Sequence, residues 1–209
     1  MSPASFPWES VPVKNLPFVA LDFETTGFDP ASEEIVELAF VPLQGSEDLF
    51  QTLVDPGIPI PPEVSKVHGI TDAEVRGQPK LAEVMGSIQF LLNDAIFVSH
   101  NVPFDWGFLH QAFVRHLKMP LQMPNLCTLE LSRRFLNIPR NNLEAVAQHL
   151  KVPLSKAHRA GADTLAVKGI LSWFLDYFDR KGMKTGGDLL RAGLIKLVPP
   201  APPPRFNRR

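Results

Sequence analysis

The segment from Phe18 to Gly27 places two carboxylates in an otherwise apolar stretch, and it constrains the fold more than any other part of the chain. Its Val, Leu and Phe residues predict a β-strand that ends at a glycine. Side chains alternate between the faces of a strand, so Asp22 and Glu24 should share one face. Close like charges need a compensating cation or a shared proton. Such an oxygen pair suits Mg²⁺ or Mn²⁺, although an edge strand with both acids in water would need no ion.

The rest of the chain alternates between strand-like and helix-like patterns. Apolar periodicity and capping residues predict strands over 34–43, 48–54 and 95–98, and helices over 71–75, 80–93, 104–118, 142–150 and 159–182, with a short strand running into a helix over 126–136. Short connections between the first three strands favour an antiparallel meander. Three strands followed by alternating helices and short strands predict an α/β fold, in which helices pack on a mixed sheet.

Length and composition suit one large globular domain with some chain to spare. The chain has 209 residues, 44% of them hydrophobic, and a formal net charge of −1. We expect an irregular proline-rich lead-in over 1–17, a folded domain over 18–181, and a C-terminal extension over 182–209 with a proline-rich tail. The near-neutral charge argues against a broadly basic surface, so any contact with nucleic acid must be local.

The cysteine count and the apolar runs bear on the cellular compartment. Cys127 is the single cysteine and cannot form an internal disulfide, which fits a reducing compartment. No apolar run approaches the roughly 20 residues that span a bilayer. The N-terminus lacks the basic start and apolar core of a secretion signal. We therefore expect a cytoplasmic protein without a membrane partner.

Two later segments carry further acids and a histidine. Asp105 follows the short strand within His100–Asp105, and Asp163 opens the last long helix five residues after His158. Taken singly, each acid is as well explained by its favourable place near a helix N-terminus. Taken together with Asp22 and Glu24, four carboxylates could hold two divalent ions about 3.5–4 Å apart, an arrangement suited to in-line displacement at phosphorus. A histidine can accept the proton of the attacking water near neutral pH.

These three segments, in this order, resemble the motifs of the DEDDh, or DnaQ-like, family of 3′→5′ exonucleases, which includes the proofreading epsilon subunit of bacterial DNA polymerase III. The matching segments are 21–27, 100–105 and 158–163, and the resemblance extends over about 18–178. It implies an RNase H-like exonuclease fold, with a central mixed five-stranded sheet flanked by helices. One departure is Cys127, where the family usually has an aspartate that is not a metal ligand. We expect a local packing difference there.

The resemblance also assigns roles to individual residues. It implies that the catalytic residues and metal ligands are Asp22, Glu24, Asp105 and Asp163, with two Mg²⁺ or Mn²⁺ ions, and that His158 is the general base. It implies substrate binding by Thr25, Glu63 and His68. Phe28 and Phe104 could stack on bases, with core packing the stronger expectation for Phe104. Candidate basic residues for the nucleic-acid backbone are Lys156, Arg133, Arg134 and Arg159, although a solvated surface explains most of them.

The sequence therefore predicts a metal-dependent 3′→5′ exonuclease that releases nucleoside 5′-monophosphates from single-stranded DNA ends. Three roles stay open: a proofreading subunit, a free-standing repair exonuclease, and an RNA-trimming exoribonuclease. A catalytically silent nucleic-acid binding module is a further alternative, which the complete set of acids and His158 disfavours. The extension over 182–209 is expected either to dock a polymerase or another replication or repair protein, or to be disordered or fold back on the domain.

Overall fold

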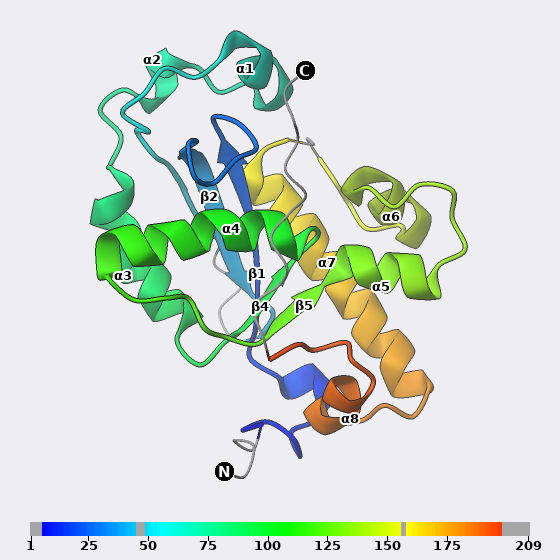
Figure 1. Ribbon diagram of the computed structural model, residues 1–209. Helices are drawn as coiled ribbons and strands as arrows, with labels where there is room; N and C mark the ends of the chain where they lie inside the picture. Colours follow the sequence, from blue (N-terminus) through cyan, green and yellow to red (C-terminus); the bar gives the residue numbers. More distant parts are fainter. Residues whose placement is uncertain (1–5, 45–48, 156–157, 198–209) are drawn as a thin grey trace.

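The computed structural model describes residues 6–44, 49–155 and 158–197, and it places a five-stranded mixed sheet at the centre of the molecule (Figure 1). The strands are β1 (Phe18–Thr25), β2 (Ile35–Pro42), β3 (Phe50–Leu53), β4 (Ile96–Ser99) and β5 (Asn125–Cys127). Their order is β3-β2-β1-β4-β5. β1, β2 and β3 are antiparallel neighbours, whereas β4 and β5 run parallel to β1. The predicted sheet and meander are confirmed; Asp48 of the expected third strand lies outside the described residues.

The helices flank this sheet on both faces. They are α1 (Pro62–His68), α2 (Asp72–Val75), α3 (Leu81–Leu92), α4 (Val102–Ala112), α5 (Thr128–Phe135), α6 (Leu143–Leu150), α7 (Ala160–Arg180) and α8 (Gly186–Arg191), and α4 continues into a π-helical turn over Phe113–Leu117. The expected helices are confirmed close to their expected bounds. α4 begins two residues earlier than 104, because Pro103 is well suited to a first helical turn. Neither α1 nor α8 is among the helices predicted from the sequence.

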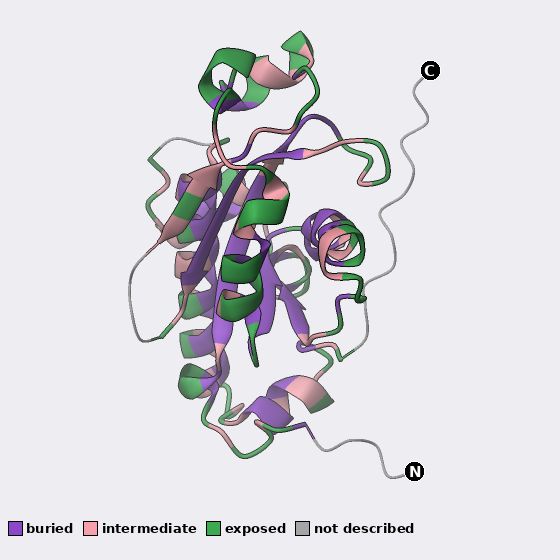
Figure 2. Cartoon of the chain, turned by 90° about the vertical axis from the view of Figure 1, so that its left-hand side faces the viewer, coloured by how far each residue is buried: buried purple, intermediate pink, exposed green. Residues whose placement is uncertain are grey.

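β1 separates two apolar clusters. Its residues Phe18 and Ala20 pack with Val167 and Phe174 of α7, whereas the alternate residues, such as Leu21, pack with α3 and α4. Figure 2 shows the central strands buried between these helical layers. Because side chains alternate along the strand, Asp22 and Glu24 continue the face that carries Phe18 and Ala20. The two acids therefore face α7.

The chain segments on either side of the expected domain pack on the α7 side of the sheet. Val13 and Leu16 from the N-terminal segment and Leu189 of α8 are buried in the cluster that holds α7. Gly186 allows the close approach, since a Cβ there would lie 2.5 Å from the carbonyl oxygen of Trp8. Residues 182–197 thus fold back on the sheet.

Within the described part of the chain, no helix has the length and apolarity to cross a bilayer.

Candidate metal centre and active site

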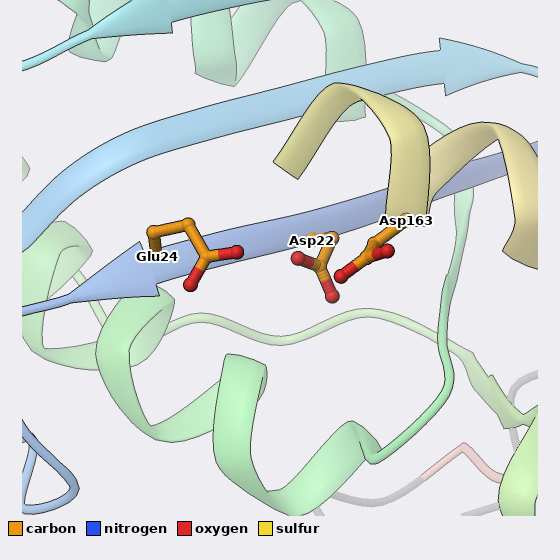
Figure 3. A group of neighbouring side chains, drawn as sticks. All are labelled: Asp22, Glu24 and Asp163. Carbon is orange, nitrogen blue, oxygen red and sulfur yellow. The ribbon is translucent and has the colours of Figure 1, made fainter. Parts of the chain in front are cut away.

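Strand β1 and helix α7 bring three carboxylates together. One oxygen from each of Asp22, Glu24 and Asp163 lies within 4.8 Å of the others (Figure 3). Asp22 and Glu24 meet because they are two residues apart on one face of β1, and Asp163 joins them from the first turn of α7. Three carboxylate oxygens at this spacing could hold a hard divalent cation.

Asp163 is held so that one carboxylate oxygen remains available. Its Oδ2 accepts a hydrogen bond from the main-chain N–H of His158 at 3.1 Å. Its Oδ1 is buried and has no hydrogen-bond partner among the described residues. A buried carboxylate oxygen without a partner is unfavourable in a folded protein unless another group, such as an ion, satisfies it. This unsatisfied oxygen shows that the donor set fits a cation.

Asp105 approaches the same acids from the start of α4. Its side chain is 3% exposed, and burial raises its pKa to about 7. It is not part of the group of three within 4.8 Å, yet its charge raises the pKa of both Asp22 and Glu24. Asp105 therefore lies within range of the charges of Asp22 and Glu24 but outside the group of three.

Burial and mutual repulsion disfavour the charged forms of these acids. Burial first, then the charges of Asp105 and Asp163, raise the pKa of Asp22 well above its usual value. Burial and the same two acids, with Glu37, raise the pKa of Glu24 to about 8, and burial raises the pKa of Asp163 to about 6. A bound divalent cation would reverse this penalty by favouring the ionised carboxylates.

Glu37 lies beside the site on β2 and is not among the site residues predicted from the sequence. Its Cα is the cross-strand partner of the Glu24 Cα, and its side chain is 1% exposed. The guanidinium of Arg159 donates to both of its oxygens, at 2.7 and 3.0 Å. These bonds lower the pKa of Glu37 against the opposing effect of burial. A single acid in an apolar strand was the available signal, because a buried charge requires a partner.

His158 lies at the surface next to the carboxylates. It directly precedes the N-cap residue of α7 and has the left-handed φ of 61°. Its main-chain N–H donates to Asp163 Oδ2 at 3.1 Å, so the residue lies directly beside the three acids. The structure therefore places an exposed histidine beside the three carboxylates.

Of the expected substrate residues, Thr25 and His68 are buried, whereas Glu63 is exposed. His68, the last residue of α1, is 3% exposed, and its Nδ1 accepts the Ile70 N–H at 3.0 Å, so its Nε2 carries the proton. That Nε2 is buried and has no hydrogen-bond partner within the described residues. Thr25 donates its hydroxyl to the Gly27 carbonyl at 2.5 Å. Glu63 is exposed in the first turn of α1 and does not belong to the group of three acids.

The two candidate stacking residues differ in exposure. The Phe28 side chain is 69% exposed, and its ring lies 6.4 Å from the Phe104 ring. Phe104 is partly buried and packs against Phe108 at 5.1 Å. Phe28 can therefore meet a base from solution, whereas Phe104 supports it from the core.

The candidate basic residues differ in whether they have a partner within the protein. Arg159 is paired with Glu37, and Arg134 donates to the Ala192 carbonyl at 2.9 Å. Arg133 is exposed on α5, and Lys156 lies outside the described residues. Arg159 and Arg134 therefore each have a partner within the protein, and Arg133 stays a prediction.

Comparisons with known proteins decide the family. A family model described as Exonuclease matches residues 19–171. The chain belongs to this exonuclease family. The exonuclease is 33% identical over 182 residues to DNA polymerase III subunit epsilon of Aquifex aeolicus, which covers 81% of this chain and 90% of that protein. It is 37% identical over 158 residues to the PolC-type DNA polymerase III of Lacticaseibacillus paracasei, covering 74% of this chain but 11% of that polymerase.

Solved structures agree on the fold of the exonuclease. The zinc-bound complex of E. coli exonuclease I with single-stranded DNA superposes with a TM-score of 0.70 at 20% identity, covering 79% of this chain and 41% of that one. Exonuclease X bound to DNA with a 5′ overhang gives a TM-score of 0.58 at 24% identity, covering 79% and 93%. The predicted RNase H-like fold and the assignment to the DnaQ-like 3′→5′ exonucleases are confirmed, and the acidic cluster is consistent with the use of a divalent metal.

Proposed function

We propose that this exonuclease removes nucleoside 5′-monophosphates from the 3′ end of single-stranded DNA. The observation that carries the proposal is the convergence of Asp22, Glu24 and Asp163, with the buried Oδ1 of Asp163 unsatisfied. A site that admits one terminal nucleotide at a time favours a single strand. The similarity to the epsilon subunit of DNA polymerase III favours DNA over RNA as the substrate.

In this proposal the four acids hold two divalent ions, Mg²⁺ or Mn²⁺. Asp22, Glu24 and Asp163 supply oxygens from the close group, and Asp105 supplies one from the start of α4. Two bound ions would activate the attacking water and neutralise charge on the scissile phosphate. His158 would accept the proton of that water on an imidazole nitrogen, because it is exposed beside Asp163 and free to meet solvent.

The rim of the site would bind the terminal nucleotide. The Nε2–H of His68 offers a buried donor, Phe28 offers an exposed ring for a base, and Thr25 and Glu63 complete the expected contacts. E. coli exonuclease I, a structural neighbour, is described in complex with a dT13 oligonucleotide. RNA trimming is the second candidate function, and it would require the rim to accept a ribose 2′-hydroxyl.

We also propose that a DNA polymerase is a protein partner of this exonuclease. The similarity to an epsilon subunit supports it. Residues 182–197 pack on the sheet, so a docking role for the C-terminal extension would fall to 198–209, which lie outside the described residues.

The direct test is degradation of 5′-labelled single-stranded DNA, duplex DNA and single-stranded RNA, each with Mg²⁺, Mn²⁺ or EDTA. We expect a ladder that shortens from the 3′ end, fastest on single-stranded DNA, and no cleavage with EDTA. Asp22→Asn is the inactive control, because the amide keeps the shape but loses the charged ligand. Faster cleavage of RNA would favour the second candidate, and equal activity of Asp22→Asn would contradict the assignment of the site.

A further inference from the structure

The carboxylate of Glu37 is enclosed by hydrogen-bond donors from two distant parts of the chain. Its Oε1 accepts from Gln51 Nε2 at 2.8 Å and from Arg159 Nη2 at 2.7 Å, and its Oε2 accepts from Arg159 Nε and the Ala160 N–H, both at 3.0 Å. We call Glu37, Gln51 and Arg159, with the main chain of Ala160, the Glu37 clamp. It connects β2 and β3 to the first residues of α7.

We propose that the Glu37 clamp is a positioning device for the active site, which fixes the main chain between His158 and Asp163. This inference rests on the function proposed above, because it concerns the residues assigned there as base and metal ligand. Neither Glu37 nor Gln51 belongs to the group of three acids, so both act through other residues.

The clamp holds the main chain at the start of α7, and this turn sets the positions of His158 and Asp163. Arg159 is the N-cap residue of α7, and no side chain of its own caps the helix. Glu37 instead accepts the otherwise unpaired N–H of Ala160, the first helical residue. Two residues before Ala160, the N–H of His158 donates to Asp163 Oδ2. A shift of this turn would therefore move the imidazole and the carboxylate together.

Only a carboxylate can satisfy this arrangement. All four partner atoms are donors, and a carboxylate can accept from all of them. A glutamine in place of Glu37 would direct its NH₂ group at other donors. A lysine in place of Arg159 would keep the charge but could not donate to both oxygens through a planar fork.

The clamp also keeps Glu37 away from a cation. Glu24 and Glu37 are cross-strand partners, and like charges placed directly opposite each other are unfavourable. Because Arg159 and Gln51 occupy both Glu37 oxygens, Glu37 does not serve as a further ligand beside Glu24. The clamp would thus fix the composition of the ligand set as well as its geometry.

Gly161 provides a second way to disturb the clamp. A Cβ on Gly161 would lie 2.2 Å from Gln51 Oε1 and 2.6 Å from its Cδ. An alanine there would displace Gln51, whose side chain is flexible, and leave Glu37 with Arg159 and Ala160. Gly161→Ala and Gln51→Ala should therefore have similar effects, and the double variant should be no worse than either alone.

The test uses the full chain with Glu37→Gln, Arg159→Lys, Gly161→Ala and Gln51→Ala. The matched control is Asp179→Asn, which removes a carboxylate charge from the 2.8 Å contact with Lys184 at the far end of α7. We measure kcat and KM on single-stranded DNA, Mn²⁺ affinity by calorimetry, and thermal unfolding. Glu37→Gln should lower kcat by about 10- to 100-fold with KM within about twofold, as expected for a small misplacement of reacting groups.

We expect Mn²⁺ affinity to fall by about fivefold or more in Glu37→Gln, smaller losses in the other three variants, and none in Asp179→Asn. A folded Glu37→Gln with the kcat and Mn²⁺ affinity of the wild type would overturn the proposal, even if its unfolding temperature fell. If Glu37→Gln does not fold, unchanged kcat in both Arg159→Lys and Gly161→Ala overturns it. If the wild type shows no nuclease activity, the proposed function fails, and Mn²⁺ affinity alone then decides whether the clamp positions the acids.

Discussion

Replacing Glu24 with glutamine should stabilise the metal-free protein at high pH and leave it unchanged at low pH. Burial and the neighbouring acids raise the pKa of Glu24 from 4.5 to about 8. A group with a raised pKa in the folded state contributes stability that is fully present below the unfolded-state pKa and is lost as the pH rises through the folded-state pKa. Glutamine resembles the protonated carboxyl group at every pH, so the variant avoids this loss.

The size of the effect follows from the two pKa values. At about 1.36 kcal/mol for each pH unit, the rise from 4.5 to about 8 sets an upper limit of about 5 kcal/mol. The limit is not reached, because Asp22 and Asp163 also have raised pKa values and share the repulsion. We expect roughly 2–3 kcal/mol at pH 8, which corresponds to about 5–10 °C in Tm for a chain of this length.

The assay is thermal unfolding in EDTA between pH 4.5 and 8.5. The control is Glu144→Gln, because Glu144 is exposed on α6. The difference in Tm between Glu24→Gln and the wild type should be near zero at pH 4.5 and grow with pH, whereas the control difference should stay small. Saturating Mn²⁺ should reverse the order at pH 8, because the wild type alone gains the full binding free energy. A difference that does not depend on pH, or a less stable metal-free variant at pH 8, would refute the reasoning.

Three further predictions concern single residues. Asp22→Ala should abolish metal-dependent cleavage without lowering the Tm in EDTA, and retained cleavage would exclude Asp22 as a ligand. His158→Ala should lower kcat by about 10²–10⁴ while oligonucleotide binding persists, and an unchanged kcat would exclude it as the base. His100→Ala should cost about 2–4 kcal/mol in urea unfolding, because buried His100 bonds Thr128 Oγ1 at 3.0 Å and the Asn141 carbonyl at 2.8 Å; a loss below about 0.5 kcal/mol would contradict this role.

The local part of the site could be predicted because strand and helix periods fix which side chains share a face. Alternation along β1 placed Asp22 and Glu24 together, and the structure confirms that they face α7 beside Asp163. The position of Asp105 in the first turn of a helix is confirmed for the same reason. These are properties of short segments, which the sequence contains in full.

The parts that escaped prediction depend on pairing between distant segments. Glu37 and Arg159 are 122 residues apart, so the isolated acid on the second strand could suggest a buried charge but not its partner. The prolines of the N-terminal segment predict an irregular lead-in, but they do not predict that Val13 and Leu16 are buried or that Pro12 pairs with Thr185. Helix α8 begins with a capping box formed by Thr185 and Asp188. The spacing of these two residues is the local signal for this helix in the sequence.

The most direct test of the central claim is the position of Mn²⁺ in crystals of the wild-type protein, found from its anomalous scattering. We expect a strong anomalous peak bounded by carboxylate oxygens of Asp22, Glu24 and Asp163, and no such peak in Asp22→Asn crystals. A peak elsewhere only, or a wild-type cluster that stays without a peak at millimolar Mn²⁺ and pH 8, would contradict it.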